Sequence, residues 1–295
     1  MALSEDKLKE IVARIVGEMI EKNQAENSNV CPSIEVTDKL EEEDIPDITE
    51  VNLKTYLAVP EAENKEEYLR LKAKTSARLG VYRAGTRYKT ETMLRFRADH
   101  AVAMDAVFTD VPEEVIKSNG LFEVQTMCES RDQYLTRPDL GRKFDEENLK
   151  LIKSQCKKSP KVQIYASDGL SSTALIANLK TVMPSIMQGL KTYGYDVGTP
   201  FFVKYGRVGA MDVITEALDA EVTVVLIGER PGLATGESMS AYMTYKGQVG
   251  MSESGRTVVS NIHSGGTPAA EAGAHIADII HEMIKQKASG LDLKI

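Results

Sequence analysis

Apolar residues recur at helical spacing near the start of the chain, from Ser4 to Ile20, with charged residues between them. This period predicts an amphipathic helix, and the Ser4 hydroxyl can cap its first amide groups. A helix of this length is marginal in water unless its apolar stripe has a partner, either another protein or the chain's own core. A membrane surface is disfavoured because the polar face carries both signs of charge. We assign residues 1–22 to this helix.

The next stretch, residues 23–48, shows no sustained period. It contains Cys31-Pro32 and an acidic run from Glu41 to Asp44, so we interpret it as a flexible linker. The helical period returns from Glu66 to Phe108 and is broken by Leu79-Gly80 and by Ala84-Gly85. This pattern predicts a small helical domain over residues 49–110.

The remaining part, residues 111–295, alternates strand-like and helix-like segments. Strands are expected at 161–169, 200–205 and 222–228, and helices at 173–189, 211–218 and 267–288. Pro184 should interrupt the first of these helices, while Thr267 should cap the last, with Pro268 opening it and Gly290 just past its end. Continuous apolar, β-branched runs mark strands covered on both faces. We therefore predict an α/β fold with a Rossmann-like, doubly wound and largely parallel sheet.

Composition narrows the functional classes. The 295 residues are 42% hydrophobic, which is enough for a full core. The formal net charge of -8 disfavours a general affinity for nucleic acid. Cys31, Cys128 and Cys156 lie far apart without a CxxC pair, so neither a disulfide framework nor a zinc site is indicated. No stretch approaches roughly 18 consecutive apolar residues, and no signal peptide pattern is found. A cytoplasmic protein without membrane contact is expected.

One segment departs from the acidic balance of the chain. Residues 70–97 contain nine basic residues and a single acidic one, Glu91. Like charges at this density repel one another unless something negative neutralises them, which favours a binding surface over a solvated basic face. An acidic partner subunit or a nucleotide phosphate could provide the negative charge, and RNA is the competing choice.

Candidate binding residues follow three of the predicted strands. They lie in the segments 167–172, 205–208 and 227–233, each of which combines glycine with polar side chains. Ligands of doubly wound sheets bind outside the carboxyl ends of the strands, so we expect these segments to meet there. The chain has no GxGxxG after its first strand and no P-loop lysine, which disfavours dinucleotide- and ATP-dependent enzymes.

One motif in the sequence contains a histidine that could bind a metal. Asn261-Ile262-His263-Ser264-Gly265-Gly266 has the spacing of the Asp-x-His-x-x-Gly motif with which many corrinoid proteins bind cobalt, but it begins with asparagine. A neutral amide orients the imidazole less well than an aspartate would. We therefore favour a His263 that hydrogen-bonds within the glycine turn. The other three histidines show no metal-site or catalytic-triad pattern.

Five longer motifs occur in one order along the chain. They are Tyr134-Leu135-Thr136-Arg137-Pro138-Asp139-Leu140-Gly141-Arg142, Ser167-Asp168-Gly169-Leu170-Ser171, Gly198-Thr199-Pro200-Phe201-Phe202-Val203, Gly228-Glu229-Arg230-Pro231-Gly232-Leu233 and Ser260-Asn261-Ile262-His263-Ser264-Gly265-Gly266-Thr267-Pro268. Together they resemble the light chain, or small subunit, of ethanolamine ammonia-lyase. The resemblance extends from Thr75 to the C-terminus, and the first part of the chain shares only a helix followed by a linker.

This resemblance implies a function shared between two kinds of subunit. Family members form a hexamer of heterodimers, with adenosylcobalamin bound where the small subunit meets the TIM barrel of the large one. The enzyme converts ethanolamine to acetaldehyde and ammonia by radical chemistry, and the large subunit carries the substrate-binding residues. The corrin keeps its own base beneath cobalt. No catalytic residue and no metal ligand is therefore expected on this chain.

The resemblance also implies three contacts to the coenzyme. They fall on Val208 after Gly206-Arg207, on Glu229 in the fourth motif, and on Val258, where a familiar family member carries cysteine. At Val258 the change implies an apolar or backbone contact without thiol chemistry. Glu229 would hydrogen-bond a hydroxyl or amide of the coenzyme, and an ordinary salt bridge with a nearby arginine is the alternative.

The family implies a location as well. Its members commonly reside in bacterial ethanolamine-utilisation microcompartments, so the helix from Ser4 to Ile20 is expected to bind a shell protein. Two other functions compete with that of a lyase subunit. One is a non-catalytic adaptor that tethers cargo to a microcompartment shell, and the other is a self-sufficient nucleotide-dependent transferase.

Overall fold

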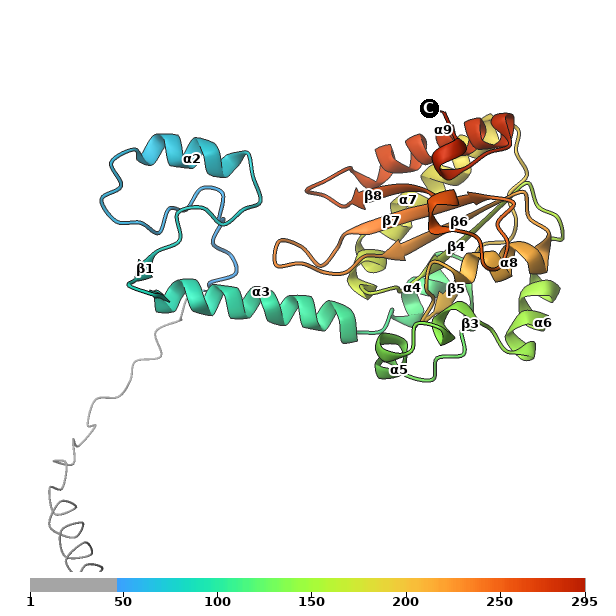
Figure 1. Cartoon of the computed structure of the whole chain (residues 1–295), viewed down its shortest axis with the longest axis horizontal. Coiled ribbons are helices and arrows are strands. Elements are labelled where there is room, and N and C mark those ends of the chain that lie inside the picture. Colours follow the sequence, from blue (N-terminus) through green and yellow to red (C-terminus); the bar gives the residue numbers. More distant parts are fainter. Residues whose placement is uncertain (1–46, 295) are drawn as a thin grey trace, which may run out of the picture. The chain divides into compact units, whose positions relative to one another are not determined.

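A computed structural model describes residues 47–294. Its centre is a six-stranded sheet with the strand order β3-β5-β4-β6-β7-β8 (Figure 1). The strands are β3 (Phe122–Gln125), β4 (Val162–Ser167), β5 (Phe201–Lys204), β6 (Val222–Gly228), β7 (Met239–Tyr245) and β8 (Thr257–Ile262). The first four in this spatial order are parallel neighbours, whereas β7 is antiparallel to both β6 and β8. The fold is therefore mixed α/β with a mostly parallel sheet, while the finer Rossmann-like description stays a prediction.

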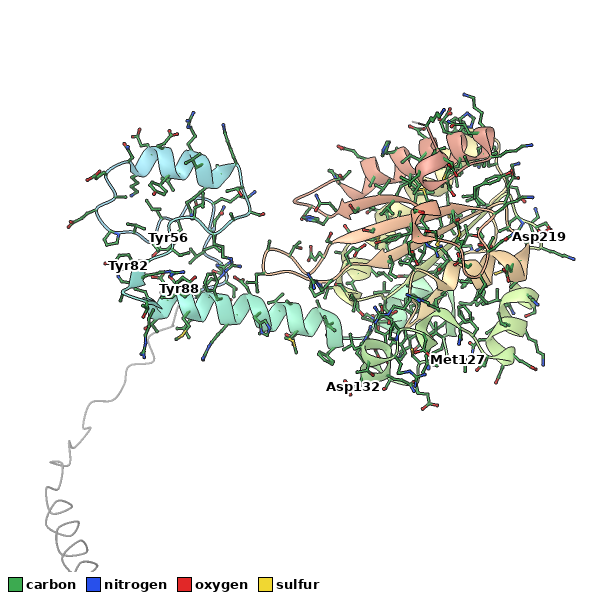
Figure 2. All side chains as sticks on the ribbon, viewed as in Figure 1. Tyr56, Tyr82, Tyr88, Met127, Asp132 and Asp219 are labelled. Atoms are coloured by element: carbon green, nitrogen blue, oxygen red, sulfur yellow. The ribbon has the colours of Figure 1, made fainter. Side chains whose placement is uncertain are left out.

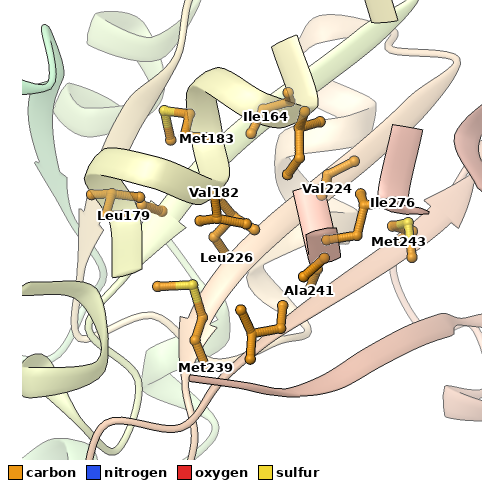
Figure 3. Packing of buried hydrophobic residues seen from close by; sticks show 14 of the residues in the cluster. Ile164, Leu179, Val182, Met183, Val224, Leu226, Met239, Ala241, Met243 and Ile276 are labelled. Atoms are coloured by element: carbon orange, nitrogen blue, oxygen red, sulfur yellow. The ribbon is translucent and has the colours of Figure 1, made fainter. Parts of the chain in front are cut away.

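Helices pack on both faces of the sheet. One face is covered by α7 (Ser172–Thr192) and α9 (Ala269–Gln286), and the other by α6 (Glu146–Gln155) and α8 (Ala210–Leu218). Every residue of β4 and β6 is buried, as the continuous apolar runs predicted. Figure 3 shows the core on the α7 side, where Val182 of α7, Leu226 of β6 and Met243 of β7 belong to one buried cluster.

The part of the chain before the sheet is much less buried. It contains α2 (Lys65–Ala73), a hairpin of β1 (Arg83–Ala84) and β2 (Arg87–Tyr88), and the long α3 (Thr90–Phe108). The predicted breaks at Gly80 and Gly85 are confirmed, because both glycines adopt a positive φ. Within residues 47–108 only Lys72, Thr92 and Ala106 are buried, although aromatic side chains such as Tyr56, Tyr82 and Tyr88 lie in this segment (Figure 2).

Short helices complete the described part of the chain. They are α4 (Glu113–Ser118), α5 (Arg131–Thr136), η1 (Leu140–Arg142), η2 (Glu253–Gly255) and η3 (Gly290–Asp292). No helix among residues 47–294 is long and apolar enough to cross a membrane. The predicted helix from Ser4 to Ile20 and nearly all of the predicted linker lie outside the described residues. The predicted domain boundary at residue 110 stays a prediction.

Three local predictions about helix ends were wrong. Pro184 lies inside α7 without interrupting it, because the neighbouring Val182, Met183 and Ile186 are fully packed in the core and hold the helix together. Thr267 does not cap α9, because the helix begins at Ala269 and Thr267 lies one residue before the cap position. Pro268 occupies the cap position instead.

The C-terminal end of α9 also differs from the prediction. The helix stops at Gln286, and Lys287 adopts the left-handed conformation that we expected a glycine to supply. The amide of Ala288 donates to the carbonyl of Met283 at 3.2 Å, so hydrogen bonds close this end without Gly290.

Candidate functional site

The three predicted loops meet at one edge of the sheet, as expected. They follow β4, β5 and β6, which are parallel neighbours, so their carboxyl ends lie side by side. The Asp168 carboxylate joins them. It accepts hydrogen bonds from the backbone amides of Tyr205 at 2.8 Å and Gly169 at 2.9 Å, and from the Arg131 guanidinium at 2.9 Å. A single buried carboxylate therefore fixes the β4 loop against the β5 loop.

Burial dominates the electrostatics of this carboxylate. Asp168 is 1% exposed, and its burial raises its pKa to about 6. The Arg131 guanidinium and the backbone donors act in the opposite direction and lower the pKa. Arg131 is itself 8% exposed and also donates to the carbonyl of Gly169. The pair is a structural link at the sheet edge, and it leaves no free charge there.

The β6 loop is held from two sides. Gly228 lies so close to the β4 loop that its carbonyl accepts a hydrogen bond from the Leu170 amide at 3.0 Å. Further along, Thr173 and Asn178 of α7 donate to the carbonyls of Gly236 and Glu237 at 2.9 Å and 2.8 Å. These contacts fix the chain on either side of Glu229.

A second region of interest is the face of β7 and β8 that α8 does not cover. Tyr242 of β7 pairs with Val225 of β6 on one side and with Val258 of β8 on the other. Cross-strand partners point to the same face, so these three side chains share one surface. Val225 is fully buried whereas Val258 is 43% exposed. The elements that pack on this face of the sheet therefore do not extend over β8, and Val258 faces solvent.

Two of the three site residues predicted from the resemblance, Glu229 and Val258, lie next to Tyr242. The Tyr242 hydroxyl donates to Glu229 Oε1 at 3.0 Å, and Val258 is its cross-strand partner. Val208 packs against the same apolar cluster as Tyr242. Among the described residues no ion pair joins Glu229 to an arginine, so the salt-bridge alternative is not what the structure shows.

Tyr242 itself was missed by the sequence analysis. Burial and the neighbouring Glu229 raise the pKa of Tyr242 to about 12, so its hydroxyl remains a donor at neutral pH. The signal that could have found it is the β7 sequence, in which Tyr242 stands between the apolar residues Ala241 and Met243. That arrangement is typical of a strand with one partly open face.

A hollow that opens to solvent lies between η1, the start of α8 and the segment before β8. Gly209, which follows Val208, lines one part of it, and Arg256, which precedes the strand β8, lines another. Arg256 is buried and forms a two-point ion pair with Asp212 of α8, at 2.8 and 2.9 Å. This pair ties β8 to α8 beneath the hollow.

His263 lies within its glycine turn, as we favoured. Its Nε2 lies 2.9 Å from Asn261 Oδ1, and its Nδ1 accepts a hydrogen bond from the Gly265 amide at 3.1 Å. Since Nδ1 is the acceptor, Nε2 carries the proton and donates it to Asn261. Both ring nitrogens are engaged within the turn, which explains why an asparagine suits the first position of the motif. Within residues 47–294 no group of histidine, cysteine and carboxylate side chains is arranged to hold a metal ion.

The described cysteines are free and buried. Burial raises the pKa of the Cys128 thiol, and it raises that of Cys156 to about 11, so neither is a thiolate at neutral pH. Cys31 lies outside the described residues.

Part of the basic segment is neutralised by its own chain. Asp99 forms ion pairs with Arg78 at 2.5 Å and with Arg95 at 3.1 Å. Arg95 also donates to the carbonyls of Ile48 and Val51. The Arg78 guanidinium reaches further and donates to the carbonyl of Leu233 at 2.7 Å, in the loop that carries Glu229.

These features define an α/β chain whose loops at the strand ends adjoin one uncovered, partly apolar sheet face. Residues 65–294 match the family described as ethanolamine ammonia-lyase light chain. The chain is 60% identical to a protein of Clostridium tetani, 55% identical to one of Fusobacterium nucleatum and 52% identical to one of Listeria monocytogenes, each named ethanolamine ammonia-lyase small subunit. Each match covers 99% of this chain and 99 or 100% of the relative. The chain belongs to the ethanolamine ammonia-lyase light-chain family, and it is thus a subunit of a lyase.

Proposed function

We propose that this chain, together with a large subunit, binds adenosylcobalamin and supports the conversion of ethanolamine to acetaldehyde and ammonia. The observation that carries the proposal is that Glu229 and Val258, from a loop and a strand far apart in sequence, both lie next to Tyr242 on a partly open sheet face. Val208 lies on a third loop and packs against the same apolar cluster as Tyr242. The surface forms one wall of a coenzyme site, and the large subunit supplies the other wall.

The chemistry of this wall fits the coenzyme. A corrin is a broad apolar ring with amide side chains at its rim, and Val208 and Val258 offer apolar contact to such a ring. The Tyr242 hydroxyl binds one oxygen of the Glu229 carboxylate and leaves lone pairs free to accept from an amide or a hydroxyl of the coenzyme. His263 offers no free ring nitrogen, which suits a coenzyme that keeps its own base beneath cobalt.

The chain's own contribution is binding, positioning and exclusion of water. The coenzyme, when bound, supplies the radical that removes a hydrogen atom from the substrate. The linked loops at the sheet edge hold the wall rigid through Asp168, and the apolar side chains keep water from that side of the coenzyme. Substrate binding and the remaining chemistry belong to the large subunit.

Residues 47–108 independently support the proposal of a large-subunit partner. Helix α3 exposes a set of apolar side chains, which are Met93, Leu94, Val102, Met104 and Phe108. Soluble chains rarely leave so many neighbouring apolar residues in water without a partner. We propose that the large subunit covers this helix in a hexamer of heterodimers, so that segment 47–108 acts as the docking element.

Reconstitution from the two purified subunits tests the proposal. Mixed with its large subunit, adenosylcobalamin and ethanolamine, the wild-type chain should support acetaldehyde formation, and neither subunit should do so alone. Full activity of the large subunit without this chain would instead support an adaptor. Turnover of a nucleotide by this chain alone would support a transferase.

Glu229→Ala should weaken coenzyme binding by the reconstituted complex by about 1–3 kcal/mol, because one buried hydrogen bond to the coenzyme is lost. Spectroscopic titration of the complex with adenosylcobalamin measures the dissociation constant. Glu237→Ala is the matched control, because Glu237 is an exposed carboxylate of the same loop that contacts α7 only through its backbone. Equal affinities of the wild type and Glu229→Ala would remove Glu229 from the site.

We further propose that the enzyme resides in an ethanolamine-utilisation microcompartment and that residues 1–22 bind a shell protein. Deleting these residues should leave the lyase activity of the complex unchanged and should disperse the enzyme through the cytoplasm. Co-sedimentation of the enzyme with purified shells measures the effect. Undiminished co-sedimentation of the truncated enzyme would contradict the proposed role of this segment.

A further inference from the structure

The hollow beside Val208 is lined by two cations without an ionic partner. Arg142 and Lys143 both contribute to it, and both are exposed. Within residues 47–294 neither side chain forms an ion pair or a hydrogen bond. The backbone that carries Arg142 is held in place, because η1 is joined to the β5 loop by a 2.7 Å hydrogen bond from the Arg207 amide to the Gly141 carbonyl.

Arg142 lies directly over Gly209. A Cβ atom at Gly209 would lie 3.2 Å from Cδ and 3.3 Å from Cγ of Arg142, so the side-chain stem touches the backbone next to Val208. The guanidinium is therefore held beside one of the proposed coenzyme contacts by packing of its own stem.

The carboxylates around the hollow neutralise these cations only in part. Asp139 is bound at two points by Arg137, at 2.9 Å each. Asp212 and Glu253 share the single guanidinium of Arg256, which leaves one negative charge uncompensated. The two charges of Arg142 and Lys143 exceed it, so the hollow keeps one net positive charge for an external anion.

We propose that Arg142, assisted by Lys143, binds the phosphodiester of the coenzyme's nucleotide loop. This inference rests on the proposed function. The phosphodiester is the one anionic group of adenosylcobalamin, and a planar guanidinium can donate two parallel hydrogen bonds to it. Gly209 follows Val208 in the chain and Arg256 lies two residues before Val258, and both line the hollow, so a corrin in contact with Val208 and Val258 has Arg142 within reach of its nucleotide loop. The site selects for a coenzyme with a complete nucleotide loop.

The test compares two coenzymes on the complex of both subunits. Adenosylcobalamin carries the phosphodiester, whereas adenosylcobinamide lacks the phosphate and the base. Arg142→Ala should weaken the binding of adenosylcobalamin by about 10- to 100-fold, since a charge-assisted contact is lost. The same variant should bind adenosylcobinamide as the wild type does. Arg142→Lys should recover part of the affinity for adenosylcobalamin.

Lys150→Ala is the matched control, because Lys150 is an exposed cation on the nearby α6 that pairs with Glu146 outside the hollow. It should leave both affinities unchanged. An equal effect of Arg142→Ala on the two coenzymes, or no effect on either, would overturn the phosphodiester assignment. Binding of inorganic phosphate that depends on Arg142, without any change in coenzyme affinity, would overturn it in favour of a free-phosphate site. A wild-type complex that binds neither coenzyme would contradict the proposed function itself.

Discussion

Gly228→Ala is expected to lower the free energy of unfolding by about 3 kcal/mol or more. A Cβ atom at this position would lie 2.6 Å from the carbonyl oxygen of Asp168 and even nearer to that of Ser171. Both are backbone atoms of the β4 loop, so no flexible side chain can move away, and one of the two loops must shift. Equilibrium unfolding in urea measures the change.

Gly232→Ala provides the control for this experiment. Gly232 lies four residues further along the same loop, and a Cβ there would meet no atom within 4 Å. Its replacement should change the stability by less than about 0.5 kcal/mol. A Gly228→Ala variant as stable as Gly232→Ala would show that the β4 and β6 loops are not held as closely as the structure places them.

Asp168→Ala should be destabilising to a similar or greater degree, by about 3–5 kcal/mol. The change removes the acceptor of two backbone amides and leaves the Arg131 guanidinium buried without its carboxylate. Urea unfolding at pH 7 measures the loss. Asp139→Ala is the control, because Asp139 also pairs with an arginine but does so in solvent, where such a pair contributes at most about 1 kcal/mol.

The variant Asp168→Asn isolates the ionisation of this carboxylate. Burial raises the pKa of Asp168 to about 6 in the folded chain, above the usual range of an aspartate. A raised pKa means that folding favours the protonated form, so this contribution is fully present below pH 4 and is lost as the pH rises through 6. The stability of the wild type relative to Asp168→Asn should therefore fall between pH 4 and pH 7. A constant difference across this range would show that Asp168 titrates normally.

The sequence predicts an element of the fold correctly where a single local pattern determines that element. The continuous apolar run at 222–228 indicates a strand covered on both faces, and 162–167 is a strand that ends in a glycine turn, so β4 and β6 and the meeting of their loops were predictable. Residues carried over by motif also led to the surface around Tyr242. Their roles as coenzyme contacts stay a prediction.

Other features depend on contacts distant in sequence. Strands β7 and β8 were missed because buried polar residues such as Ser240 and Thr244 hide the apolar pattern. The cap of α9 was misplaced by one residue, because the glycine turn before the helix delays its start to Ala269. The hollow beside Arg142 requires η1, α8 and the start of β8 to come together, and only the folded chain shows that.

Strand β8 is the last strand of the sheet, so its outer backbone amides and carbonyls have no neighbouring strand within the described chain. Such an unpaired edge strand can pair with a strand of another polypeptide, and the exposed apolar side chain of Val258 favours this association. Isolated copies of the chain would therefore tend to associate with one another through β8.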